Sequence, residues 1–75
     1  MTPTVVTNSI RRLRFDHREM TQQDLAERVG VTRQTVNAIE TGKYSPSLEV
    51  AFRMAEVFGV RVDEVFHYGA PKKNR

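Results

Sequence analysis

Hydrophobic residues recur three or four positions apart in four consecutive stretches of the chain. The inward-facing positions of the first three stretches are Ile10 and Leu13, then Leu25 and Val29, then Val36 and Ile39. The fourth stretch follows helical spacing through Leu48, Ala51, Phe52, Ala55 and Phe58. This spacing puts each set on one face of a helix. The pattern predicts helices over residues 8–18, 21–29, 32–41 and 47–58, and Val62, Val65 and Phe66 indicate a short fifth helix over residues 62–66.

Residues suited to helix ends flank these stretches. The candidate N-caps, whose side-chain oxygens can accept a hydrogen bond from the first turn, are Asn8 or Ser9, Thr21, Thr32 and Ser47. Asp24, three residues after Thr21, completes an approximate capping box. Gly30, Gly42 and Gly59 suit the left-handed conformation that ends a helix. A turn of about three or four residues that contains Gly30 therefore joins the second and third helices.

The two ends of the chain have a different pattern from the middle. Residues 4–7 and 65–68 are rich in β-branched and aromatic residues, which favour strands. Two interpretations stay open: the ends pair as a small antiparallel sheet, or each is a frayed arm, because an isolated two-stranded pair is marginal unless it packs on a core. We therefore expect an N-terminal arm or strand over residues 1–7, a helical domain over 8–66, and a C-terminal strand or tail over 67–75.

Length and composition indicate one small globular domain. The 75 residues leave no room for a second core, and 39% hydrophobic with 28% charged residues is an ordinary balance. No apolar run approaches the roughly 20 residues of a membrane-spanning helix. The chain starts without a secretory signal and contains no cysteine, which favours a cytoplasmic protein. The net charge of +3 adds little, because Lys72, Lys73 and Arg75 equal that excess.

Two helices joined by a glycine-containing turn can place the second helix in the major groove of DNA. The outward positions of that helix, opposite Val36 and Ile39, are Arg33, Gln34, Asn37, Ala38 and Thr41. Arginine can donate two hydrogen bonds to guanine, while glutamine and asparagine can pair with adenine. An ordinary solvated helix face is the alternative, but such a face usually includes glutamate and lysine, which this one lacks. The stripe therefore predicts contacts with double-stranded DNA, with Thr41 on its backbone.

Polar residues bracket this stripe on both sides. Gln22 and Gln23 begin the second helix, where side chains and N-terminal N–H groups can hold a phosphate. Lys43, Tyr44 and Ser45 follow the third helix and can contact the DNA backbone on its other side. Each residue alone is weak evidence, since surface glutamines and lysines are usually only solvated. Their position on either side of the stripe predicts contacts with the DNA backbone.

Residues 21–36, TQQDLAERVGVTRQTV, resemble the helix-turn-helix of phage Cro and CI repressors and their bacterial relatives, the XRE family. The likeness continues through residues 39–43, IETGK, residues 45–48, SPSL, and residues 58–60, FGV, and it is collinear over about residues 8–66. The resemblance implies a five-helix domain like that of lambda repressor. It also implies a sequence-specific transcriptional regulator, with repression as the family-level expectation.

The resemblance assigns roles to individual residues. It implies that the domain contacts DNA through the residues that match the family's contact positions, which are Gln22, Thr32, Arg33, Gln34, Asn37 and, on a phosphate, Lys43. It also implies an ion pair between Arg14 and Glu40, which would tie the first helix to the end of the third. Ala38 departs from the family, because some phage repressors carry a base-reading glutamine there. It can touch at most a thymine methyl group.

A second departure lies between the first two helices. Glu19 and Met20 lengthen this connection by one residue relative to the commonest family pattern. The end of the first helix is therefore less firmly placed by the resemblance than the second and third helices are.

A homodimer is expected, because one helix reads only about four or five base pairs and a two-fold partner reads the symmetric half-site. The expected interface is C-terminal. It comprises Val62, Phe66 and Tyr68, with Phe52 and Val57 as neighbours. These residues offer more apolar area than the fifth helix needs for its own packing. Burial within the domain is the alternative for them, and we favour it for Val65.

No catalytic site, metal or cofactor is expected. His17 and His67 have no cysteine partner and no metal-ligand spacing to a nearby carboxylate, so surface or partly packed histidines are the better interpretation. An antitoxin, or another module of this fold that binds a protein partner, is an alternative function. A controller of a restriction–modification system is another possibility within the DNA-binding class. Co-purification with a neighbouring gene product would separate a protein-binding module from a simple operator-binding protein.

Overall fold

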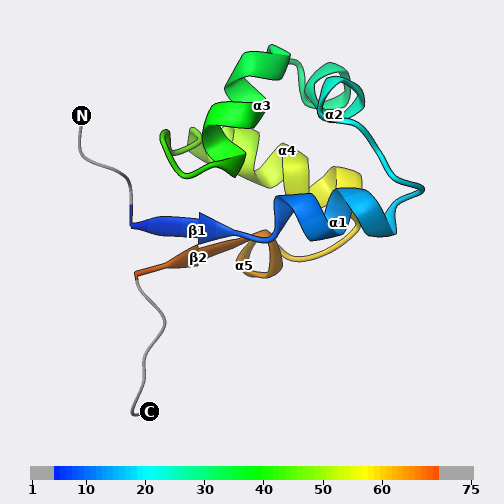
Figure 1. Cartoon of the computed structure of the whole chain (residues 1–75). Coiled ribbons are helices and arrows are strands. Elements are labelled where there is room, and N and C mark those ends of the chain that lie inside the picture. The colour runs from blue at the N-terminus through cyan, green and yellow to red at the C-terminus, as the bar shows by residue number, and fades with distance from the viewer. Residues whose placement is uncertain (1–4, 70–75) are drawn as a thin grey trace.

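A computed structural model of the chain describes residues 5–69, which form five helices and a two-stranded antiparallel sheet (Figure 1). The elements in chain order are β1, Val6–Asn8; α1, Ile10–Asp16; α2, Gln22–Val29; α3, Arg33–Glu40; α4, Leu48–Phe58; α5, Val62–Val65; and β2, Phe66–Tyr68. The predicted five-helix fold with a small terminal sheet is confirmed. The sheet brings the two ends of the described chain side by side (Figure 1).

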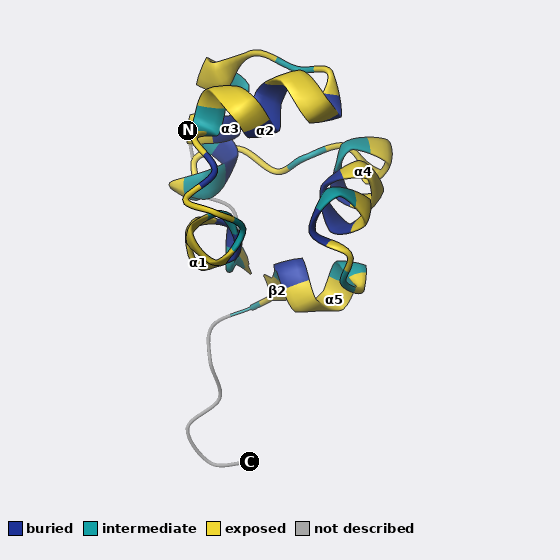
Figure 2. Cartoon of the chain, turned by 90° about the vertical axis from the view of Figure 1, so that its right-hand side faces the viewer, coloured by how far each residue is buried: buried dark blue, intermediate teal, exposed yellow. Residues whose placement is uncertain are grey.

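The five helices share one hydrophobic core. Each helix contributes a side chain that is 0% exposed: Ile10, Leu25, Val36, Met54 and Val65 in turn. In Figure 2 the buried residues lie on the inner sides of the helices and the exposed residues on their outer sides. Fully burying one such side chain contributes roughly 1.5–3 kcal/mol of transfer free energy. Every helix is therefore held against the same core.

The turn between α2 and α3 forms as the sequence predicts. Thr21 Oγ1 accepts a hydrogen bond from the Asp24 N–H at 2.9 Å, and the Asp24 carboxylate accepts one from the Thr21 N–H at 3.3 Å. Thr32 Oγ1 accepts from the Thr35 N–H at 3.1 Å. Gly30 ends α2 with a φ of 89°, which a side chain would strain. These local bonds produce the helix-turn-helix.

Helix α1 is shorter than predicted. It covers Ile10–Asp16, so the prediction of a helix over residues 8–18 is wrong at both ends. Arg18 and Glu19 have φ values of 61° and 55°, and this left-handed conformation cannot continue a right-handed helix. The next residue, Met20, is only 7% exposed and returns the chain to the core. Two left-handed residues thus accommodate the longer connection to α2.

The sheet, rather than a pair of frayed arms, is the conformation of the described ends. Opposite one another lie Val6 and Tyr68, Thr7 and His67, and Asn8 and Phe66. β1 covers Val6–Asn8 and so extends one residue beyond the segment 4–7. β2 starts at Phe66, one residue later than the segment 65–68, because Val65 is fully buried as the last residue of α5. Thr4 lies outside the described residues. The Ser9 N–H donates to the Val65 carbonyl at 2.9 Å, so the sheet leads directly into the packed helices.

The left-handed conformation of Glu19 can be tested with glycine. It costs a residue with a side chain roughly 1–2 kcal/mol, which exceeds the roughly 0.5–1 kcal/mol of unfolded-chain entropy that glycine adds. We therefore expect Glu19→Gly to raise the free energy of unfolding, measured by urea titration, by about 0.5 kcal/mol. Glu27→Gly in the middle of α2 is the control and should lower it by about 1 kcal/mol. A loss of stability in both variants would contradict strain at Glu19.

Candidate nucleic-acid interface

Helix α3 has a buried side and an exposed polar side. Val36 and Ile39 are 0% and 2% exposed, and they fix the helix on the core. The opposite side carries the residues predicted to read bases: Thr32, Arg33, Gln34 and Asn37, all exposed, and Ala38, which is half-buried. The structure therefore gathers the predicted stripe on one outward face.

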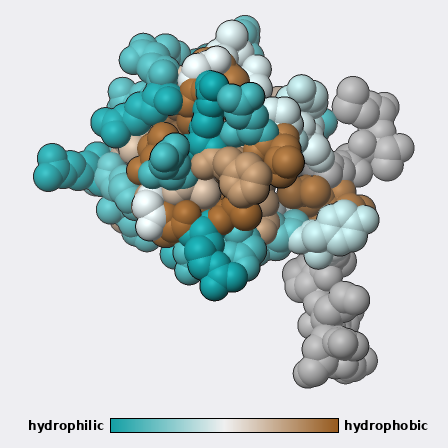
Figure 3. Space-filling view, turned by 180° about the vertical axis from the view of Figure 1, so that it is seen from behind, coloured by the Kyte–Doolittle hydropathy of each residue, from teal (hydrophilic) through white to brown (hydrophobic). Residues whose placement is uncertain are grey.

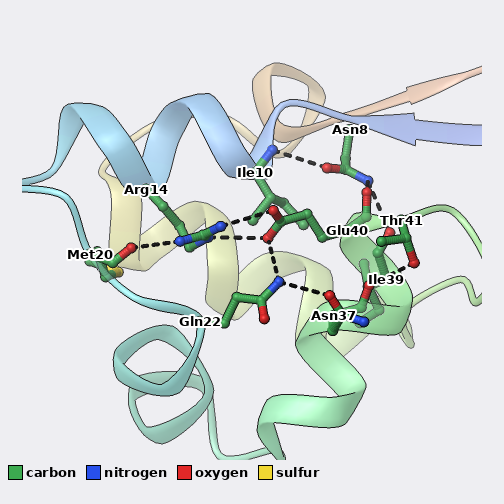
Figure 4. A network of polar contacts seen from close by, with 9 residues as sticks. All are labelled: Asn8, Ile10, Arg14, Met20, Gln22, Asn37, Ile39, Glu40 and Thr41. Carbon is green, nitrogen blue, oxygen red and sulfur yellow. Dashed lines mark hydrogen bonds and ion pairs between the residues drawn. The ribbon is translucent and has the colours of Figure 1, made fainter.

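Glu40, the one acidic residue of α3, is held by Arg14 of α1. Arg14 donates from Nε to Oε1 of Glu40 at 3.1 Å and from Nη2 to Oε2 at 2.9 Å. The side chains of Arg14 and Glu40 are only 15% and 10% exposed, so water screens this two-pronged pair little. Arg14 Nη1 also donates to the Met20 carbonyl at 2.8 Å. The structure brings together the two residues that the resemblance pairs, and they join α1, its connection to α2, and α3 (Figure 4).

Gln22 links the start of α2 to this ion pair. Its Nε2 donates to Asn37 Oδ1 at 3.1 Å and lies 3.4 Å from Glu40 Oε1 (Figure 4). A residue predicted to hold a phosphate therefore contacts one predicted to read a base. Sequence spacing gives no sign of this contact, since it depends on how two helices cross.

Asn8 is a positioning residue that sequence reasoning recognised only as a possible cap of the first helix. Its Oδ1 accepts from the Ile10 N–H at 3.1 Å, so Asn8, and not Ser9, caps α1 with its side chain. Its Nδ2 donates to the carbonyls of Ile39 and Glu40 at 3.0 and 3.3 Å. Asn8 thus ties the start of α1 to the last carbonyls of α3, which a helix leaves without internal partners.

Some of the predicted contact residues already have partners within the domain. The Thr32 hydroxyl caps α3, and the Thr41 hydroxyl donates to the main-chain oxygen of Asn37 at 2.8 Å. Gln23 Nε2 donates to Glu27 Oε2 at 2.9 Å. A hydroxyl that gives its proton to the protein can only accept from outside, and phosphate oxygens also accept. Thr41 is therefore a poor phosphate donor, whereas the Gln23 amide keeps a second N–H.

Lys43, Tyr44 and Ser45 lie in the loop directly after α3, and all three are exposed. A surface hollow of about 410 Å³ joins this loop to the outward side of α3; it is lined by Gln34, Thr35, Ala38, Lys43 and Tyr44. The loop predicted to contact the DNA backbone therefore adjoins the predicted base-reading residues.

The residues predicted for a dimer interface differ in exposure. Tyr68 on β2 is 83% exposed and Phe52 on α4 is 53% exposed. Val62 and Phe66 are half-buried and pack against the core. Val65 is 0% exposed, so its expected place inside the domain is confirmed.

The two histidines make structural contacts. His17 Nδ1 and Nε2 lie 2.9 and 3.1 Å from the carbonyl oxygens of Leu13 and Phe58, and its ring packs edge-on against Phe58 at 5.3 Å. His67 Nε2 lies 3.2 Å from Ser9 Oγ. Within residues 5–69 no group of histidines and carboxylates could hold a metal ion. None of the helices described is both long and apolar enough to cross a membrane.

The sequence profile of the helix-turn-helix proteins matches residues 10–65, which span α1 to α5. The chain belongs to this family. The resemblance to Cro- and CI-type regulators of the XRE family is thereby confirmed. These proteins are DNA-binding transcriptional regulators and not enzymes.

Three similar proteins illustrate the family. An uncharacterized HTH-type transcriptional regulator of Methanocaldococcus jannaschii is 55% identical over 49 residues, which cover 65% of this chain and 74% of the relative. A cryptic phage CTXphi transcriptional repressor of Vibrio cholerae is 36% identical over 59 residues, 79% of this chain and 52% of the repressor. The crystal structure of a transcriptional regulator from Listeria innocua superposes with a TM-score of 0.70 at 25% identity, covering 92% of this chain and 67% of that one.

Removal of Arg14 tests how much the ion pair stabilises the domain. We expect Arg14→Met to lower the free energy of unfolding by about 2–4 kcal/mol, because Glu40 would stay largely buried without a charged partner. Chemical denaturation followed by circular dichroism measures this loss.

Arg12→Met is the matched control on the same helix. The Arg12–Asp16 pair has an N–O distance of 3.8 Å and side chains that are 67% and 52% exposed. Its loss should change stability by less than about 0.5 kcal/mol. If both variants lowered the free energy of unfolding by similar amounts, the Arg14–Glu40 pair would stabilise the domain no more than the exposed Arg12–Asp16 pair does.

Proposed function

We propose that the chain binds a two-fold symmetric DNA operator as a homodimer and represses transcription there. The observation that carries the proposal is the exposed side of α3, which presents Arg33, Gln34 and Asn37 while the helix's one carboxylate is turned inward. The major groove admits a helix of this size, and its base edges offer the donors and acceptors that these side chains match. Membership of the helix-turn-helix family supports the same function.

The side chains of α3 and of its N-cap, Thr32, contact different groups on the bases. Arg33 can donate two hydrogen bonds to guanine, and Gln34 can pair with adenine. Ala38, half-buried beside Gln34, can contact a thymine methyl group. Thr32 uses its hydroxyl as a cap and has its methyl group for such a contact. Asn37 contributes through its amide.

Contacts with the DNA backbone come from both sides of α3. Gln22 and Gln23 lie in the first turn of α2, where N–H groups are free to meet a phosphate. Lys43, Tyr44 and Ser45 provide a positive charge and two hydroxyl groups in the loop after α3. Such contacts carry little sequence information, but they fix the register of the protein on the duplex.

Selection from a random DNA pool, followed by affinity measurements, tests these roles. We expect a two-fold symmetric consensus with half-sites about one helical turn apart. Arg33→Ala should weaken binding to this consensus by about 1–3 kcal/mol and relax one base pair of each half-site. Lys43→Ala should weaken binding to all sequences alike and lower the salt slope by about 1.

Two results would argue against the proposal in different ways. If both variants weakened all sequences equally, the division into base-reading and backbone residues would be wrong. If the wild-type protein enriched no sequence, operator binding itself would fail, and the protein-binding module would become the better interpretation.

The proposed dimer interface lies around β2 and α5. Tyr68 is almost fully exposed, and Val62 and Phe66 present their outer parts beside it. Figure 3, which views the molecule from behind, shows hydrophobic atoms in a broken band from the middle of this face toward the sheet. Exposed apolar side chains gathered on one face often mark a protein interface. A second copy docked here would give each operator half-site one α3.

Repression is proposed by analogy with the phage CTXphi repressor of Vibrio cholerae, which is similar over 79% of this chain. The physical basis is occupancy. A dimer that covers both half-sites of an operator excludes other proteins from the same stretch of DNA.

Tyr68→Ser tests the dimer interface. We expect it to raise the dimer dissociation constant about tenfold in sedimentation equilibrium, since buried interface tyrosines commonly contribute more than about 1 kcal/mol. Tyr44→Ser, at the other exposed tyrosine, should leave self-association unchanged. Dimers of equal strength in both variants would exclude this surface.

A further inference from the structure

We infer that Gln22 determines which base Asn37 reads, by fixing the direction of the Asn37 amide. The inference rests on the proposed insertion of α3 into the major groove. It names a specificity role for a residue otherwise expected only on the DNA backbone.

The direction of the Gln22 amide follows from its neighbour Glu40. A carboxylate paired with a guanidinium is ionised and can only accept hydrogen bonds. Glu40 Oε1 lies 3.4 Å from Gln22 Nε2, while Arg14 holds both carboxylate oxygens from the other side. Gln22 must therefore turn its NH₂ group, and not its carbonyl, toward this cluster.

The direction of the Asn37 amide follows in turn. The Gln22 NH₂ group donates to Asn37 Oδ1 at 3.1 Å (Figure 4). Turning the Asn37 amide round would set two NH₂ groups face to face and lose this hydrogen bond. Gln22 thus uses one of the two lone pairs of Asn37 Oδ1 and holds this oxygen toward α2, while Nδ2 makes no hydrogen bond to any residue of the described range 5–69. The Nδ2 donor is therefore the part of the Asn37 amide that the fold leaves for DNA.

This polarity changes the expected base preference. A free asparagine pairs with adenine by donating to N7 and accepting from the N6 amine. With Oδ1 held toward Gln22, a pair with the adenine N6 amine has to use the second lone pair of this oxygen, whereas Nδ2 donates without hindrance, and guanine presents two neighbouring acceptors, N7 and O6. Asn37 in this protein should consequently favour guanine over adenine.

The experiment compares purines at the operator position that Asn37 reads. Selection from a random pool with the wild-type protein and with Asn37→Ala identifies that position, where only the variant loses its preference. Dissociation constants are then measured for duplexes with guanine or adenine there. We expect wild type to favour guanine roughly three- to tenfold, the weight of one net hydrogen bond.

Gln22→Met is the decisive variant, and Gln23→Met is its matched control. Gln22→Met removes the donor that holds Asn37, so the amide can turn and the guanine preference should fall below about twofold. Gln23→Met removes the same group from the next residue, which contacts Glu27 and not Asn37, and should keep the wild-type ratio. A merely structural role for Gln22 would weaken both duplexes equally and leave the ratio unchanged.

Three outcomes would overturn the inference. They are a wild-type preference for adenine, an unchanged ratio in Gln22→Met, and the absence of any position at which Asn37→Ala alters preference. Each of them presupposes an enriched operator, so the inference can fail while operator binding stands. A wild-type protein that enriches no sequence would overturn the proposed function itself, and this inference with it.

Discussion

The ion pair between Arg14 and Glu40 is the interaction on which the arrangement of the DNA-binding helices depends. Glu40 is the last residue of α3, where the helix dipole disfavours a negative charge, and its side chain is only 10% exposed. A carboxylate in that place is tolerated because Arg14 supplies two hydrogen bonds and a compensating charge. The same guanidinium reaches the Met20 carbonyl, so one side chain fixes α3 against both α1 and the entrance to α2.

The strained connection between α1 and α2 serves this arrangement. Arg18 and Glu19 take left-handed conformations, after which Met20 places its side chain in the core and its carbonyl beside Arg14. If α1 continued as a regular helix through residues 18 and 19, Met20 would lie further along α1. The Nη1 group of Arg14 would then lose its acceptor, the Met20 carbonyl. The left-handed residues thus cost conformational energy locally, and the buried methionine and the hydrogen bond to Arg14 offset it.

The sequence predicted what depends on neighbouring residues and missed what depends on distant ones. The caps at Thr21 and Thr32 act within one turn, so residue type and spacing were enough to place the turn between α2 and α3. The end of α1 was misplaced, since neither Arg18 nor Glu19 has the residue type that usually marks a left-handed position. Asn8 caps carbonyls 31 and 32 residues away, and Gln22 contacts Asn37 across two helices. No periodicity encodes such contacts.

The hydrogen bonds and ion pair around Glu40 connect some exposed residues of α3 to the fold and leave others unconnected. Arg33 and Gln34 make no side-chain hydrogen bond within the described part of the chain, so a substitution at either position removes no such bond from the fold. Asn37 is joined through Gln22 to Glu40, and Glu40 to Arg14, so its amide belongs to the interactions that hold the helices together. In the proposed complex with DNA, a change of base preference at Asn37 therefore requires a partner of different polarity on α2, whereas changes at Arg33 or Gln34 do not. The proposed base-reading face thus combines one side chain, Asn37, that is coupled to the stability of the fold with two, Arg33 and Gln34, that are independent of it.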